Sequence, residues 1–164
     1  MVSALAPALL AQLLDHEPVA RLALLDDAGE PQVMPIVFAR VGTQIFSPVD
    51  GKPKSHARLA RLRHIEAHPR VALVIDRYAA DWQQLWWVRI AADAYIAGTQ
   101  HPAWAAAVSA LESKYPQYQT TPLFWGEPTM ICFEPLAVRA WAFAGPDGIA
   151  DSLAADTARI AAPL

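Results

Sequence analysis

Alternating apolar and polar positions recur along the 164-residue chain and predict β-strands. Asp26–Gly29 has the composition of a hairpin turn between the first two of them, with a glycine that tolerates positive φ. Pro35 removes a hydrogen bond from the second strand, so we expect that strand to be at a sheet edge, bulged, or not paired at that point. The predicted strands are residues 18–25, 32–39, 44–47, 71–78, 85–97 and 129–143.

Apolar residues three and four positions apart predict helices at the N-terminus, after the third strand and after the fifth. These helices span residues 3–14, 55–68 and 101–115, and residues 1–16 form a leading segment. The Ala-rich tail 145–164 is predicted to be weakly structured. Most connections between strands are too short for parallel crossovers, so the sequence favours one mainly β domain with helices, folded as a closed or nearly closed barrel.

Trp86 and Trp87 are adjacent in the long fifth strand, so they point to opposite faces of the sheet. Only one of them can enter the core of a single sheet. The other needs a second buried surface, which a dimer interface or a cofactor would supply. Arg89 lies on the same face as Trp87, and there we expect it to meet an anion, a carbonyl or water; an ion pair with Asp76 or Asp93 is the alternative.

A cluster of basic residues begins where the second helix is predicted to start. Lys52 and Lys54 precede Ser55, a good helix-capping residue, and Arg58 and Arg61 continue the same stripe. Free N–H groups and the helix dipole favour an anion at this end of a helix, so the pattern predicts a phosphate site. A solvated basic helix face is the alternative interpretation. The single Gly51 does not match the Gly-rich phosphate loop.

The composition limits the class of protein. A hydrophobic content of 54% with six Trp residues is high for a small monomer, so we expect a homodimer. No apolar run approaches the roughly 20 residues of a membrane span, and no signal peptide is recognisable. One cysteine fits a reducing, cytoplasmic location. No metal-ligand spacing is present.

No nucleophile motif is present, and Cys132 lies in an apolar strand as an expected inert core thiol. Chemistry carried by a bound cofactor is consistent with this lack. Binding of single-stranded nucleic acid is disfavoured, because the net charge is −3 and the basic residues are confined to one element.

Taken together, the motifs PVARLALLDDAGEPQVMPIVFA, IFSPVDGKPKS, RLRHIEAHPRVALVID and DWQQLWWVRIAADA resemble the pyridoxamine 5′-phosphate oxidase-like split-barrel flavoproteins. The resemblance covers residues 18–94 and extends more loosely to VRAWAF. It is strongest to a branch of probable coenzyme F420-dependent oxidoreductases. It implies a split β-barrel and a homodimer that holds flavin-type cofactors at the subunit interface.

The resemblance also implies site residues. The second strand would line the cofactor ring and the third would contact it, while the turn and helix that follow would bind its phosphate. The other subunit's fifth strand and a C-terminal tryptophan would complete the site. The implied cofactor-binding residues are Met34, Pro35, Ile36, Val37, Phe46, Ser47, Lys52, Lys54, Ser55, Arg61, Trp87, Arg89 and Trp141.

Two functions remain open. The first is an FMN- or F420-dependent oxidoreductase acting on a small organic substrate. The second is a non-catalytic barrel that sequesters or senses flavin or haem. The second strand reads VMPIVFARV and lacks the run ending in Lys that true pyridoxamine 5′-phosphate oxidases carry, and their C-terminal substrate-phosphate residues have no match here. Oxidation of pyridoxamine 5′-phosphate is therefore not the expected reaction.

Overall fold

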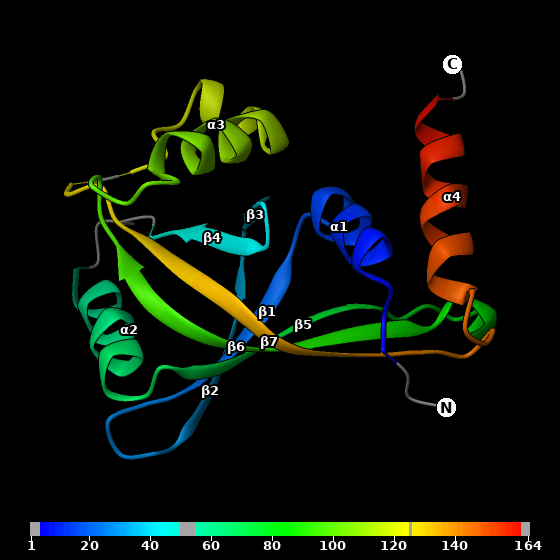
Figure 1. The fold of residues 1–164 in the computed structure, drawn as a ribbon, viewed down its shortest axis with the longest axis horizontal. Coiled ribbons are helices and arrows are strands. Elements are labelled where there is room, and N and C mark those ends of the chain that lie inside the picture. Colours follow the sequence, from blue (N-terminus) through cyan, green and yellow to red (C-terminus); the bar gives the residue numbers. More distant parts are fainter. Residues whose placement is uncertain (1–3, 50–54, 125, 162–164) are drawn as a thin grey trace.

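The computed structural model describes residues 4–49, 55–124 and 126–161, without the side chains of 55–59 and 157–161. The six predicted strands and three predicted helices occur in the predicted order, and the structure adds the short strand β3, two 3-10 helices and the helix α4 (Figure 1). The elements are α1 (Pro7–His16), β1 (Ala20–Leu25), β2 (Pro31–Ile36), β3 (Ala39–Val41), β4 (Gln44–Pro48), α2 (Ser55–Ala67), β5 (Arg70–Arg77), η1 (Trp82–Gln84), β6 (Trp86–Ala97), α3 (Trp104–Lys114), η2 (Pro116–Gln119), β7 (Met130–Ala142) and α4 (Gly148–Ala161).

The strands form one seven-stranded sheet in the order β2-β1-β5-β6-β7-β4-β3, and every pairing is antiparallel. The sheet curls, yet β2 and β3 at its two ends do not pair with each other within the described residues. The barrel is therefore split rather than closed by strand pairing. β2 is an edge strand, as its Pro35 predicts, and this edge position removes the cost of the missing N–H group.

The hairpin between β1 and β2 is stabilised by Asp26. Its Oδ1 atom accepts hydrogen bonds from the backbone N–H groups of Ala28 and Glu30, both at 2.9 Å. Gly29 adopts a φ of 81°, a left-handed conformation that glycine tolerates without strain. The predicted turn is confirmed, and its side-chain hydrogen bonds explain why an aspartate begins it.

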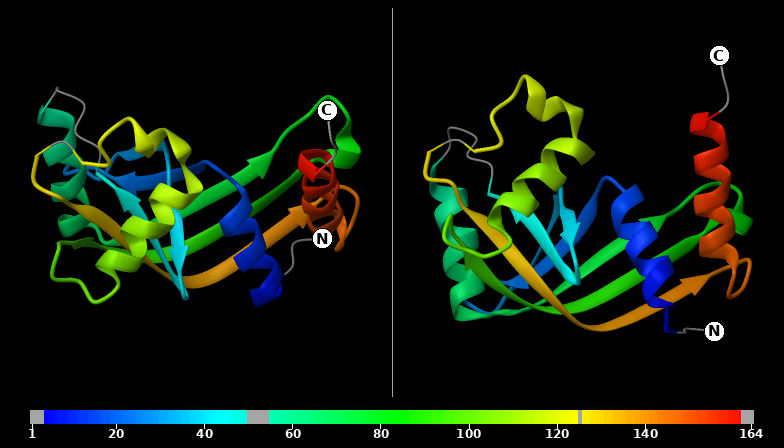
Figure 2. Two further views of the ribbon diagram at one scale, coloured as in Figure 1. Left: turned by 90° about the horizontal axis from the view of Figure 1, so that it is seen from above. Right: turned by 45° about the horizontal axis from the view of Figure 1, so that its top comes forward.

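The main core lies on one side of the sheet and is covered by helices α1, α2 and α4. Leu13, Ile65 and Leu153 come from these helices and pack against the apolar face of strands β1, β5, β6 and β7. Trp86 is 1% exposed and is the largest fully buried side chain of this core. In Figure 2 the long strands form a curved floor with α1 and α4 above it.

A smaller core forms where α3 packs against the ends of β4, β6 and β7. Phe46, Leu111 and Cys132 meet there. The Tyr115 hydroxyl joins this core to the split in the barrel. It accepts a hydrogen bond from Phe38 N at 2.9 Å and lies 2.8 Å from the carbonyl oxygens of Pro18 and Phe38. The phenol thus satisfies buried backbone groups that strand pairing leaves open.

The C-terminal tail differs from the sequence prediction. Residues 148–161 form helix α4 rather than a weakly structured segment, and Ile149 and Leu153 enter the main core. Two apolar residues four positions apart are a weak helical signal in an Ala-rich segment, and the sheet surface that receives them is visible only in the folded chain.

None of the helices in the described ranges is both long enough and apolar enough to cross a lipid bilayer.

Candidate functional site

Strands β1, β5, β6 and β7 expose the side of the sheet that is opposite the main core. Along β1, β5 and most of β6 the inward residues are buried, whereas their neighbours are half-buried or exposed. In β7 residues 130–133 are all buried, and exposed residues occur only after them. Helices α1 and α4 lie above the long strands in Figure 1 and cover only the other side. We call this uncovered surface the open face; it consists of the three rows of residues defined below.

Strand register places the open-face residues in three parallel rows. The aromatic row runs across β5, β6 and β7, the arginine row runs from β2 to β7, and the small-residue row lies beside the arginine row. The rows are Asp76–Trp87–Trp141; Pro35–Arg21–Val74–Arg89–Arg139; and Val33–Ala23–Ala72–Ala91–Ala137.

Trp87 and Trp141 are directly paired across β6 and β7, and both are half-buried. Trp86 points into the core and Trp87 to the open face, so the predicted division of the two tryptophans is confirmed. Side chains directly opposite on an antiparallel pair have Cβ atoms about 4.5–5.5 Å apart. The register therefore places the two tryptophans as neighbours on the open face, where a planar ring could contact both.

Arg89 and Arg139 are paired in the next row and are both exposed. The alternative ion pairs of Arg89 are not formed. Asp76 pairs with Arg21, and Asp93 pairs with Arg70 through an Nε–Oδ1 distance of 2.7 Å. Sequence reasoning selected Arg89 but missed Arg139, because only strand register shows that the two side chains are neighbours.

Four of the predicted site residues therefore lie on the open face. Trp87, Arg89 and Trp141 are neighbours on β6 and β7, whereas strands β1 and β5 separate Pro35 from Arg89.

Five others lie elsewhere. Ile36 is 5% exposed and belongs to the main core, and the half-buried Met34 packs against that core. Phe46 and Ser47 are each 1% exposed, and Phe46 packs edge-on to His101 at a centroid distance of 5.4 Å. Val37 is half-buried against the α3 core. We assign Phe46 and Val37 to packing around α3, which approaches from a segment more than 50 residues later in the chain, while Ser47 is a buried residue of β4.

The predicted phosphate site is only partly described. Lys52 and Lys54 lie outside the described residues, and only the backbone of Ser55 is described, as the first residue of α2. Arg61 is half-buried on that helix. Arg63 is engaged with Asp27 of the β1–β2 turn through an Nε–Oδ2 distance of 2.7 Å, so it is not available for a cofactor.

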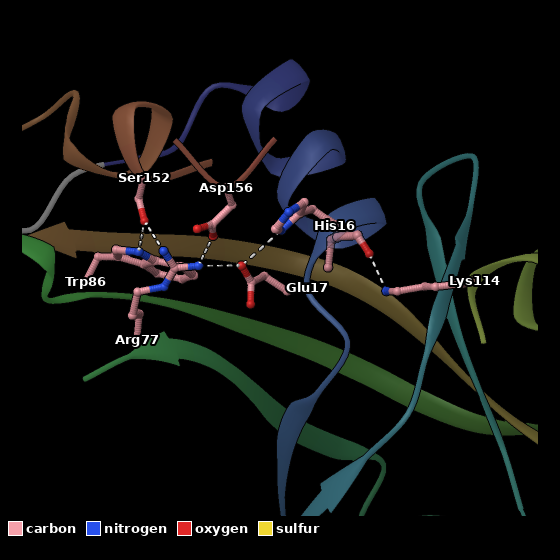
Figure 3. Close-up of polar contacts among 8 residues, drawn as sticks. His16, Glu17, Arg77, Trp86, Lys114, Ser152 and Asp156 are labelled. Carbon is pink, nitrogen blue, oxygen red and sulfur yellow. Dashed lines mark hydrogen bonds and ion pairs between the residues drawn. The ribbon is translucent and has the colours of Figure 1, made fainter. Parts of the chain in front are cut away.

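A second polar cluster attaches α4 to the sheet (Figure 3). Arg77 donates to Ser152 Oγ at 2.7 Å and pairs with Asp156, while Glu17 lies 3.5 Å from its Nη2 atom. Trp86 Nε1 also donates to Ser152 Oγ at 3.0 Å. His16, Glu17 and Asp156 could together ligate a metal, but the guanidinium already provides the positive charge between the two carboxylates. We interpret the cluster as structural.

Cys132 has no arrangement that would make it a nucleophile. It is fully buried, and this burial raises the pKa of its thiol to about 11. Its neighbour Tyr95 contacts His101 Nε2 through its hydroxyl at 3.0 Å, and burial also raises the pKa of Tyr95. A thiol that remains protonated at neutral pH is a poor nucleophile, which agrees with the interpretation of Cys132 as an inert core residue.

The model of one protein family, pyridoxamine 5′-phosphate oxidase, matches residues 6–142, which is most of the chain. The chain belongs to the pyridoxamine 5′-phosphate oxidase family. No curated protein shows significant sequence similarity to it. The family match supports the split-barrel resemblance and leaves its F420-dependent branch without specific support.

Solved structures of other proteins share the fold. A haem-binding protein from Mycobacterium smegmatis superposes with a TM-score of 0.65 at 17% identity, over 87% of this chain and 57% of its own. This chain thus spans little more than half of that protein. The haem storage protein HutZ from Vibrio cholerae superposes with a TM-score of 0.63 at 15% identity, over 85% of this chain and 95% of its own. A FAD-binding protein from Mesorhizobium loti superposes with a TM-score of 0.60 at 16% identity, over 85% of this chain and 96% of its own. At these identities the likeness establishes the split-barrel fold.

Proposed function

We propose that this protein binds FMN against the open face, between two copies of the chain, and acts as an oxidoreductase on a small organic substrate. The observation that carries the proposal is the paired Trp87 and Trp141, adjacent to the unneutralised Arg89 and Arg139. An aromatic surface beside fixed positive charge is complementary to a planar ring that bears an anionic group.

The residues present fit such a cofactor. The indoles would contact the ring, and Arg89 would face its polar or anionic edge. The proposed ligands of the cofactor phosphate remain Lys52 and Lys54, which precede α2 in the sequence, Ser55, its first residue, and Arg61, near its middle. A flavin itself accepts and donates the electrons, so the protein has to bind, orient and shield it. This division of labour is consistent with the inert Cys132.

The open face also supports the proposal of a dimer. A single sheet face covers only one side of a planar ring, whereas bound small molecules are usually enclosed on most sides. Val33, on the open face, is 66% exposed, and Leu25 and Leu136 of neighbouring strands are 39% and 50% exposed. A second copy packed on this face would bury these side chains and provide the second wall.

A haem is the second candidate, because two of the structural neighbours are named as haem proteins. Haem iron in proteins is held by His, Cys, Met or Tyr ligands. None of the residues in the three open-face rows is of these types. This composition favours a flavin. F420 and FAD share the planar ring and acidic tail and remain alternatives to FMN; FAD-binding proteins are among the neighbours.

Titration of the purified, cofactor-free protein with FMN, FAD, F420 and haemin tests the assignment. We expect saturable binding of FMN with quenched flavin fluorescence, and transfer of electrons from a chemical reductant through the bound flavin to an acceptor. Tight binding of haemin alone would overturn the flavin assignment. Binding of FMN without any electron transfer would instead favour the sequestering function.

A further inference from the structure

Arg89 and Arg139 form an unusual pair on the open face. They are directly opposite in the β6–β7 pairing, and both side chains are exposed. Like charges at directly opposed positions of an antiparallel sheet destabilise it. A sequence that keeps two arginines there accepts a cost in stability, and such local conflicts in folded proteins concentrate at functional sites.

The carboxylates near this pair are already engaged. Asp76 lies one row away from Arg89 but pairs with Arg21, and Asp93 pairs with Arg70. Glu134 of β7 accepts from Gln44 Nε2 at 3.2 Å. No described side chain forms an ion pair with Arg89 or Arg139. The two guanidinium groups therefore carry a positive charge that the folded chain does not balance.

We infer that Arg89 and Arg139 together bind a phosphate or carboxylate group of a ligand on the open face. Each guanidinium offers five N–H donors in a planar fork that matches such oxyanions, so two of them can bind one group from both sides. The adjoining Trp87–Trp141 surface indicates that the ligand is an aromatic or otherwise planar organic anion. This inference rests on the proposed flavin function and deepens it.

The anionic group has two possible sources. It is either the phosphate of the flavin itself, which would then bind at the arginine pair and not at Lys52, Lys54, Ser55 and Arg61, or the acidic group of a separate substrate, with the flavin phosphate at those four residues. A comparison of FMN with riboflavin, which lacks the phosphate, distinguishes these two sources. The affinity for each ligand is measured for wild type, Arg89→Gln, Arg139→Gln and Arg139→Lys. Inorganic phosphate is titrated in parallel into FMN-loaded and cofactor-free protein. Arg70→Gln is the matched control, because it removes one exposed arginine of the same sheet.

Two results support the inference. Weaker binding of FMN by about ten- to a hundredfold in Arg139→Gln, with riboflavin unchanged, identifies the cofactor phosphate as the anion. Unchanged flavin binding with a similar loss of phosphate affinity in the loaded protein identifies a separate acidic ligand. In both cases Arg139→Lys retains part of the affinity, and Arg70→Gln matches wild type.

Removal of Arg139 should also raise the melting temperature of the cofactor-free protein, because the repulsion with Arg89 disappears. If Arg139 served only to stabilise the fold, its removal would lower the melting temperature. If both Gln variants match wild type for FMN, riboflavin and phosphate, the inference is wrong. If no flavin binds at all, the proposed function fails, while phosphate binding to the cofactor-free protein still decides whether the arginine pair is an anion site.

Discussion

Trp87 of β6 lies directly opposite Trp141 of β7 on the open face, one row away from Arg89 and Arg139. Trp86, the neighbour of Trp87, is enclosed in the main core. Because successive side chains of a β-strand point to opposite faces, Trp86 packs in the core and Trp87 lies in the candidate site.

Replacing Trp87 or Trp141 with Ala should weaken the binding of FMN. Loss of an aromatic contact with the ring costs roughly 1–2 kcal/mol, which is about a five- to thirtyfold increase in Kd. Flavin fluorescence titration measures the change. Trp82→Ala is the matched control, because Trp82 is 65% exposed and packs on Phe143 at the end of the sheet. An equal loss in all three variants would contradict a specific role for the open-face pair.

Arg77 should stabilise the attachment of α4. Its side chain is 26% exposed, and those of Glu17 and Asp156 are 12% and 14% exposed. Arg77→Gln leaves these two carboxylates close together without their cation, so we expect a loss of roughly 1–3 kcal/mol in the free energy of unfolding. Urea denaturation measures it. Arg70→Gln breaks a far more exposed ion pair and should cost less than about 1 kcal/mol. If both variants lost the same free energy of unfolding, the Arg77 cluster would stabilise the protein no more than an exposed ion pair does.

Tyr115→Phe should destabilise the barrel at its split. The variant keeps the ring but removes the oxygen that accepts from Phe38 N. An unsatisfied buried N–H group costs about 1–3 kcal/mol, which urea denaturation would detect. Tyr118→Phe on the adjacent 3-10 helix keeps the ring contact with Tyr115 and is the comparison. A Tyr115→Phe variant as stable as wild type would mean that water or another group replaces the hydroxyl.

Lys114 should give the protein a pH-dependent stability. Its Nζ atom donates to Leu14 O at 2.7 Å, and burial lowers the pKa of this amine to about 8 (Figure 3). Above this value the unfolded chain binds more protons than the folded one, so stability rises with pH from about 8 towards the unfolded pKa near 10.5.

Free energies of unfolding between about pH 7 and 9.5 test this, below the range where tyrosines ionise. We expect a rise in wild type that is smaller in Lys114→Gln. Burial raises the pKa of Tyr115 to about 12. The contribution of Tyr115 to the free energy of unfolding is therefore fully present below about pH 10 and declines only at higher pH. An identical slope in both proteins would contradict the assignment to Lys114.

Sequence reasoning predicted the strands well, because half-buried strands leave an alternating pattern. It expected a strand at residues 71–78, and β5 occupies Arg70–Arg77. Of the three alternatives that Pro35 left for its strand, an edge position, a bulge or a missing pairing, the structure shows the edge position. Sequence reasoning failed for site residues whose surroundings depend on contacts between distant parts of the chain. Phe46 adjoins the basic segment in sequence, but α3 folds back to cover it. Arg139 became a candidate only through its register with Arg89.

The central claim is that FMN and a second copy of the chain both occupy the open face. Ala72 lies in the small-residue row, flanked by Ala23 and Ala91, so Ala72→Arg places a long charged side chain there without disturbing the core. Ala105→Arg on the exposed surface of α3 is the matched control.

Sedimentation velocity with detection of bound FMN measures both properties at once. We predict that wild type and Ala105→Arg sediment as dimers carrying flavin, and that Ala72→Arg is a folded monomer without it. An Ala72→Arg protein that remains dimeric and binds FMN as tightly as wild type would contradict the account.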